Sequence, residues 1–126
     1  MIIRLAQIDD VPAVVDIYNQ AIPSRKSTGD TQPLRVEERL TWFREHRPDA
    51  HPIFVAEAEG QVAGWCSLSP YRPGLRIRHL FAIVLEGNQA SLKLLENMGF
   101  EQWGFLPRVA DFDGYEVGHL YYGRHL

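Results

Sequence analysis

The stretch that decides the fold runs from Arg78 to Phe100 and reads RHLFAIVLEGNQASLKLLENMGF. Its first part, residues 79–84, is an apolar run that predicts a strand, and the leucines that follow recur at the spacing of a helix. Asn88 stands where an N-cap is wanted, and Ser91 can share the first free amides of the helix. Gly99 suits the left-handed residue that ends a helix. We therefore expect strand, tight turn, capped helix and a second strand.

Length and composition limit the classes of protein to which this chain can belong. Its 126 residues are enough to bury a core and too few for two domains, so we expect a single domain over residues 1–126. A net charge of -3 argues against nucleic acid as a partner, because binding a phosphate backbone needs a basic excess. No apolar run approaches the roughly 18 residues of a membrane span, and nothing resembles a signal peptide. We expect no membrane partner and a cytoplasmic location.

Cysteine and histidine chemistry is sparse in this sequence. Cys66 is the single cysteine, which excludes an intrachain disulfide and a thiolate zinc site. Its apolar neighbours predict a buried strand, so we expect a structural thiol there. The five histidines have no metal-ligand spacing, and a lone histidine is more often structural than catalytic. We assign none of them a role, expect no metal, and leave the catalytic residues unassigned.

The first 70 residues predict a strand, two helices, and then two strands joined by a hairpin. Asp9 and Asp10 before Pro12 mark the start of the first helix. Ala58-Glu59-Gly60-Gln61 is the hairpin signal. The predicted ranges are residues 2–6 for the first strand, about 35–45 for the second helix, and 53–57 and 62–69 for the hairpin strands.

This order of elements, with several motifs, resembles the GNAT superfamily of N-acetyltransferases. Residues 88–100 match the family pattern N-x-x-[AS]-x-x-L-[YH]-x-x-x-G-[FY], except that Leu95 stands at the tyrosine or histidine position. Tyr71-Arg72-Pro73-Gly74 resembles the arginine–proline turn of the phosphinothricin and methionine sulfoximine acetyltransferase branch. Weaker matches extend from Ile17 to the last two predicted strands. The resemblance implies a three-layer α/β fold with flanking helices around a mixed, mostly antiparallel sheet.

The same resemblance implies a function. It implies acetyl transfer from acetyl-CoA to the primary amine of a small amino acid or analogue, of the phosphinothricin or methionine sulfoximine type. The implied cofactor-binding residues are Asn88, Ser91 and Asn97, and the implied substrate-binding residues are Arg72, Pro73 and Gly74. Two plainer interpretations stay open, namely that Asn88 only caps its helix and that Arg72 is a solvated loop arginine.

The resemblance fails between Gly74 and Arg78. There the family would place a strand, a phosphate-binding loop and a long helix, which need on the order of 30 residues, and this sequence has Leu75-Arg76-Ile77. The absent strand would carry the acidic residue that takes a proton from the amine. Either this sequence omits a segment that the molecule has, or the molecule has lost it. In the second case the alternative is a non-catalytic GNAT-derived module for binding or dimerisation.

The end of the chain suggests how the protein assembles. Adjacent Tyr121 and Tyr122 must point to opposite faces of a sheet, so one of them can be buried while the other lies outside. Trp103 and Phe105 of the preceding strand are expected to join the outer tyrosine in an aromatic patch. Relatives in the branch are commonly homodimers. We therefore expect a two-fold homodimer that uses the C-terminal strands.

Overall fold

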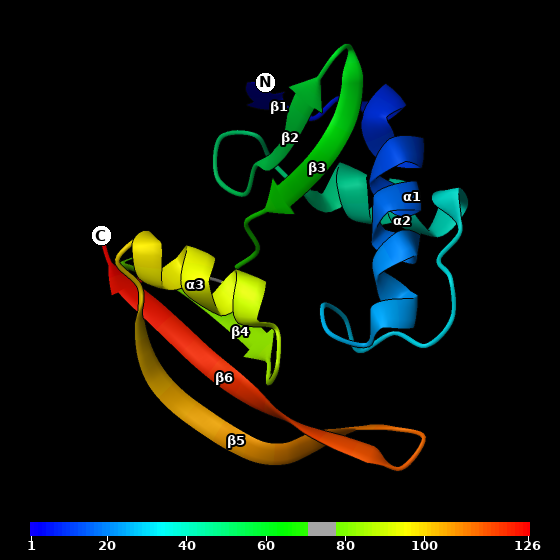
Figure 1. The fold of residues 1–126 in the computed structure, drawn as a ribbon. Helices are drawn as coiled ribbons and strands as arrows, with labels where there is room; N and C mark the ends of the chain where they lie inside the picture. Colours follow the sequence, from blue (N-terminus) through cyan, green and yellow to red (C-terminus); the bar gives the residue numbers. More distant parts are fainter. Residues whose placement is uncertain (71–77) are drawn as a thin grey trace. The chain divides into compact units, whose positions relative to one another are not determined.

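The computed structural model describes residues 1–70 and 78–126 (Figure 1). The chain divides into two units, unit 1 with Met1–Gln20 and Gln32–Gly74, and unit 2 with Ala21–Thr31 and Leu75–Leu126. In chain order the elements are β1 (Ile2–Leu5), η1 (Ile8–Asp10), α1 (Val11–Ala21), η2 (Ile22–Ser24), α2 (Val36–Glu45), β2 (Ile53–Ala58), β3 (Gln61–Ser67), β4 (His79–Leu85), α3 (Gln89–Asn97), β5 (Glu101–Phe112) and β6 (Tyr115–His125).

Unit 1 is built on a three-stranded antiparallel sheet with the order β1-β2-β3. The β2–β3 connection is the predicted hairpin, with a turn of two residues where four were expected, and Glu59 and Gly60 in this turn both have positive φ angles, 54° and 76°. Two positive angles match the twist of the strands that such a turn joins. Val55, at 0% exposure in the middle strand, and Val14 of α1 are among the fully buried side chains. Burial of these side chains stabilises the helix–sheet contact.

An aromatic group joins both helices of unit 1 to its sheet. Trp65 of β3 lies with its ring centroid 6.3 Å from that of Tyr18 in α1 and 5.7 Å from that of Trp42 in α2. The guanidinium carbon of Arg39 lies 3.9 Å from the Trp42 ring centroid, within the range of a cation–π contact. Both helices therefore lie on the face of the sheet that carries Trp65.

The position of Cys66 corrects our expectation of a buried thiol. Cys66 is exposed. Successive strand residues point to opposite faces, and Trp65 points toward the helices, so Cys66 points away from them. Its cross-strand neighbour Phe54 is also exposed, as is Leu5 opposite Phe54. This second face of the sheet is apolar in sequence, which is why the sequence alone indicated burial.

A cluster of ion pairs connects β1 to the 3-10 helix η1 and to β2 in unit 1. Arg4 of β1 donates from Nη1 and Nη2 to the two carboxylate oxygens of Asp10, at 2.7 and 2.9 Å, and from Nε to Glu57 of β2 at 2.9 Å. The Gln7 amide also donates to Asp10, at 2.7 Å. Hydrogen bonds from Arg4, with a further one from the Gln7 backbone, hold the pKa of Asp10 below its usual range. Asp10 therefore stays ionised although it is only 9% exposed.

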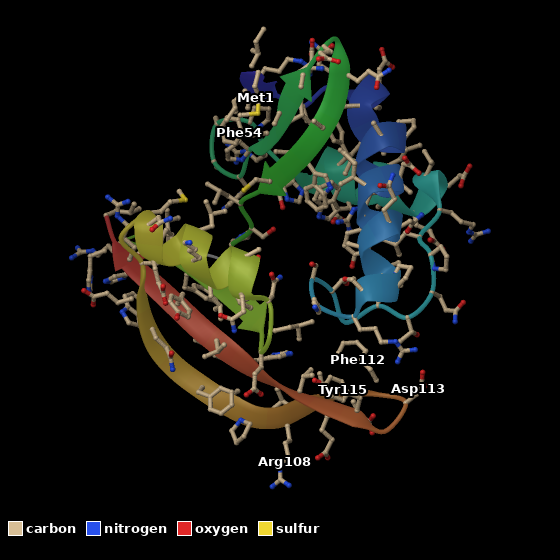
Figure 2. The ribbon with its side chains drawn as sticks, viewed as in Figure 1. Met1, Phe54, Arg108, Phe112, Asp113 and Tyr115 are labelled. Carbon is tan, nitrogen blue, oxygen red and sulfur yellow. The ribbon has the colours of Figure 1, made fainter. Side chains whose placement is uncertain are left out.

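Unit 2 is built on a second antiparallel sheet, with the order β4-β6-β5. The β5–β6 ribbon continues past β4, and Asp113 and Tyr115 lie at its turn (Figure 2). Arg25, from the segment between the two helices, donates to Asp113 at 2.7 Å and lies over the Phe112 ring. These contacts attach the Ala21–Thr31 segment to the ribbon inside unit 2.

The aromatic residues near the C-terminus fall on two faces, where we expected one. Tyr122 is the buried tyrosine, and its hydroxyl donates to Glu96 of α3 at 3.0 Å. Trp103 packs on Gly123, while Phe105 packs on Gly118. Positions 118 and 123 of one strand point to opposite faces. The reason is the irregularity between Gln102 and Gly104, where an extra residue reverses the alternation of β5.

The predicted fold class is confirmed, since the described residues form antiparallel sheets with flanking helices. They form two sheets of three strands, and we expected one mixed sheet. Within the described parts of the chain, β3 pairs with β2 alone and β4 pairs with β6 alone. The central strand that the resemblance places between them in chain order is the one that the sequence lacks. The expectation of a single domain stays a prediction. No helix in residues 1–70 or 78–126 combines the length and apolar character needed to span a bilayer.

Candidate functional site

A cavity of about 250 Å³ lies within unit 2. Its walls come from the Lys26–Gly29 loop, the end of β4, the start of α3 and one position of β6. The lining residues are Lys26, Ser27, Thr28, Gly29, Ile83, Val84, Leu85, Asn88, Ser91 and His119. The volume is below the roughly 300 to 1,000 Å³ of pockets that hold drug-sized ligands. It suits a group of the size of an amino acid or the end of a cofactor arm.

Asn88 is the residue that joins two walls of this cavity. Its side-chain oxygen accepts from the Ser91 amide at 3.2 Å, which confirms the predicted N-cap of α3. Its side-chain nitrogen donates to the carbonyl of Lys26 at 3.0 Å. Helix start and loop are therefore held together by one side chain. Gly99, with a φ of +77°, ends the helix region in the left-handed conformation that the sequence predicted.

The structure brings two of the three predicted cofactor residues to the cavity. Asn88 and Ser91 both line it. Asn97 is the last residue of α3, about 9 Å along the helix axis from Ser91 at 1.5 Å per residue, and is not among the lining residues. The predicted substrate residues Arg72, Pro73 and Gly74 lie outside the described residues, so their assignment stays a prediction.

The electrostatic character of the cavity follows from its walls. Lys26 supplies a positive charge, and the first amides of α3 carry the positive end of the helix dipole. Among the residues that the structure assigns to the lining there is no carboxylate. The cavity therefore favours an anionic or carbonyl-bearing group. The described residues hold no cluster of three or more metal-ligating side chains.

His119 is a cavity residue that the sequence did not identify. It lies on β6 directly opposite Leu85, the last residue of β4, and Leu106 of β5. Spacing alone gave no signal, because the neighbours of His119 in the cavity come from segments 28 to 93 residues earlier in the chain. His119 could have been found only by pairing the last predicted strand with residues 79–85, since this pairing places His119 beside the turn before Asn88.

Comparison with known proteins gives relatives that align with all or most of this chain. A candidate phosphinothricin acetyltransferase, YwnH of Bacillus subtilis (strain 168), is 34% identical, and the alignment covers 100% of this chain and 99% of that protein. An L-methionine sulfoximine/L-methionine sulfone acetyltransferase from Pseudomonas aeruginosa is 27% identical, with 85% of this chain and 84% of the relative covered. A comparison with protein-family models gives no match.

The alignment with the Bacillus relative shows how many residues this chain lacks. It is 163 positions long and takes in all 126 residues of this chain, so the difference of 37 positions has no residue here. That number is close to the length of a strand, a loop and a long helix, which need on the order of 30 residues or more. The Bacillus relative therefore has 37 residues along the alignment that this chain lacks, about the number that the absent segment would need.

Solved structures give the same family. The crystal structure of a candidate phosphinothricin N-acetyltransferase is 34% identical, with a TM-score of 0.90 over 99% of this chain and 98% of the other. A GNAT superfamily phosphinothricin acetyltransferase from Sinorhizobium meliloti, solved in complex with AcCoA, is 19% identical and shares the fold at a TM-score of 0.90, over 99% and 88% of the two chains. On the full-length identity of 34% the chain belongs to the GNAT superfamily of N-acetyltransferases, in the phosphinothricin and methionine sulfoximine acetyltransferase branch.

Proposed function

We propose that this protein transfers an acetyl group from acetyl-CoA to the primary amine of a small amino acid or analogue, of the phosphinothricin or methionine sulfoximine type. The observation that carries the proposal is the cavity in which the Asn88-capped start of α3 meets the Lys26–Gly29 loop, in a chain of this family. Relatives named as acetyltransferases align with the whole chain or most of it, so the non-catalytic alternative is not favoured.

The reaction that we propose is direct transfer. A neutral amine attacks the thioester carbonyl, hydrogen-bond donors stabilise the oxyanion, and the thiolate leaves. The free amides at the start of α3 and the side chain of Asn88 supply donors on one wall of the cavity. Asn88 and Ser91 are assigned to the acetyl-CoA arm, with Asn97 a weaker candidate. A small cavity that holds the reacting end of the acetyl-CoA arm limits the positions from which the amine can attack, and this proximity is what such a transfer needs.

Arg72, with Pro73 and Gly74, is assigned to the acceptor. A guanidinium can hold a carboxylate through two charge-assisted hydrogen bonds, and losing them from a partly buried site costs on the order of 1.5 to 3 kcal/mol. Arg72→Ala should therefore raise KM for methionine sulfoximine roughly 10- to 150-fold, at about 1.4 kcal/mol for each factor of ten. The KM for a plain alkylamine should stay near the wild-type value. Thiol release from acetyl-CoA, followed at varied acceptor concentration, gives both KM values.

The matched control is Arg44→Ala, which removes an exposed arginine from the last turn of α2. It should leave both acceptors unaffected. An equal rise of KM for both acceptors in Arg72→Ala would contradict the carboxylate contact. A wild-type protein that releases no thiol with any amino-acid acceptor would contradict the proposed function itself.

A second test separates the cofactor role of Asn88 from its role as a helix cap. Asn88→Ala should lower the free energy of unfolding by about 1 kcal/mol, the usual value of an N-cap, and should also raise KM for acetyl-CoA. Asn88→Asp keeps an oxygen for the Ser91 amide and loses the donor to Lys26. It should therefore retain the N-cap of α3 and still raise KM for acetyl-CoA. Urea titration and steady-state kinetics give the two quantities, and an unchanged KM in both variants would leave Asn88 a cap alone.

We also propose that the protein is a homodimer and that it is cytoplasmic. A homodimer through the C-terminal strands is supported by the half-exposed Trp103 on the face of the unit 2 sheet opposite α3, at 47% exposure. Phe105 does not share that face, so the aromatic patch is smaller than the sequence indicated. A cytoplasmic location and the lack of a nucleic-acid partner are supported by the composition alone.

A further inference from the structure

One histidine lines the cavity that the proposed function uses. His119 is half-buried on β6 and lines the cavity together with Asn88 and Ser91. Its side chain is on the face of the sheet opposite α3, because the residues at even positions of β6, Tyr122 and Arg124, contact α3. The Lys26–Gly29 loop forms the remaining wall.

The size of the cavity limits how far His119 can be from the reaction. A volume of about 250 Å³ holds a small group and not a whole cofactor. If Asn88 and Ser91 hold the arm of acetyl-CoA at one wall, the reacting end of that arm occupies a space that His119 also lines. An imidazole is the side chain whose proton exchange falls in the range of roughly pH 5 to 8, which is the range that general acid–base catalysis requires.

We propose that His119 is a catalytic residue that carries a proton from the acceptor amine to the leaving thiolate. The assignment rests on the proposed function and adds the proton-transfer group that the sequence left open. A separate proton donor is needed because Leu95, which stands at the tyrosine or histidine position of the family pattern, has no proton to give.

The neutral imidazole takes a proton from the ammonium group of the acceptor, which leaves a free electron pair on nitrogen. That pair forms the new C–N bond at the thioester carbonyl, and the C–S bond breaks with its electron pair going to sulfur. The imidazolium of His119 then protonates the thiolate. The acylated nitrogen loses its second proton to water and becomes a neutral amide, while the imidazole is already neutral after protonating the thiolate.

The charged groups around His119 are few. Lys26 is the other titratable side chain among the residues that line the cavity. Glu86 directly follows the last residue of β4. The Glu86 carboxylate accepts a hydrogen bond from the amide of Gly118 at 3.0 Å. The Glu86 carboxylate is therefore hydrogen-bonded to the backbone of the residue that precedes His119 in β6. His79 and His125, also on paired strands, contact each other with ring centroids 4.4 Å apart and are not among the lining residues.

The test uses the full chain of 126 residues with millimolar acetyl-CoA and methionine sulfoximine, and follows thiol release between pH 5.5 and 9.5. His119→Gln should lower kcat by about 10² to 10⁴-fold, the usual contribution of general acid–base catalysis, with KM for acetyl-CoA within about twofold of wild type. The limb of the kcat/KM profile that rises between roughly pH 5 and 8 should disappear, because glutamine has no proton to exchange in this range.

His119→Ala provides a second measurement, because added imidazole should enter the vacated space and restore part of the activity. The matched control is His125→Gln, which removes an exposed histidine from the same face of β6 and should leave kcat unchanged. Wild-type turnover with an unaltered profile in His119→Gln, and no rescue by imidazole, would overturn the assignment and leave the proposed function intact. A wild-type chain without thiol release would overturn the proposed function, and this assignment with it.

Discussion

Asp10→Ala is expected to lower the free energy of unfolding by about 2 to 4 kcal/mol. Asp10 accepts three hydrogen bonds, two from Arg4 and one from the Gln7 amide, and is 9% exposed. A hydrogen bond to a charged group contributes about 1.5 to 3 kcal/mol, and groups left unpaired in a poorly solvated place add to the loss. Urea unfolding monitored by circular dichroism measures the difference.

The effect of Asp10→Ala should depend on pH. The pKa of Asp10 lies below its ordinary value of 3.8 in the folded protein, so the carboxylate stabilises the fold fully above that value. The contribution is lost as pH falls through the lowered folded-state pKa. The stability difference between wild type and variant should therefore shrink below about pH 4. Asp9→Ala, which removes an exposed carboxylate from the same 3-10 helix, is the control and should show neither effect.

Inserting between Gly74 and Arg78 the strand, phosphate-binding loop and long helix that the family resemblance implies there is expected to tighten acetyl-CoA binding at least 100-fold. The resemblance implies that consecutive backbone amides at the start of that helix would hold the pyrophosphate, and this sequence has three residues between Gly74 and Arg78. Two hydrogen bonds to a charged group, at about 1.5 to 3 kcal/mol each, already correspond to that factor. Calorimetric titration of acetyl-CoA into both proteins gives the two dissociation constants.

The insertion has a structural counterpart in unit 1. The sheet face opposite the helices leaves Ile3 at 68%, Leu5 at 45% and Phe54 at 36% exposure, an apolar surface of the kind that a covering helix buries. The control is a flexible Gly/Ser insertion of the same 37-position length, which should not tighten binding. Micromolar binding by the chain without any insertion, or equal tightening by the flexible control, would contradict the prediction.

The sequence predicted the elements whose causes are local. The cap at Asn88, the left-handed Gly99 and the turn at Glu59-Gly60 each depend on the chemistry of a few neighbouring residues. The structure contains all of them where the sequence placed them. The same holds for the order of helices and strands, because each segment carries its own apolar periodicity.

Features that depend on distant residues were missed or misplaced. Cys66 was expected to be buried because the sequence does not tell which sheet face the helices cover. Trp103 and Phe105 were placed on one face because a bulge in β5 leaves no mark in the alternation of the sequence. His119 enters the cavity through strand pairing and not through any motif. Arg72, Pro73 and Gly74 lie outside the described residues and remain predictions.

The distribution of the three tryptophans gives the two units separate optical signals. Trp42 and Trp65 belong to unit 1, where Arg39 lies against the Trp42 ring, while Trp103 belongs to unit 2 and packs on Gly123. Loss of structure in one unit changes the fluorescence of its own indoles and leaves the other emission as an internal reference. Indole emission therefore distinguishes a chain that melts in one cooperative step from one whose units melt independently.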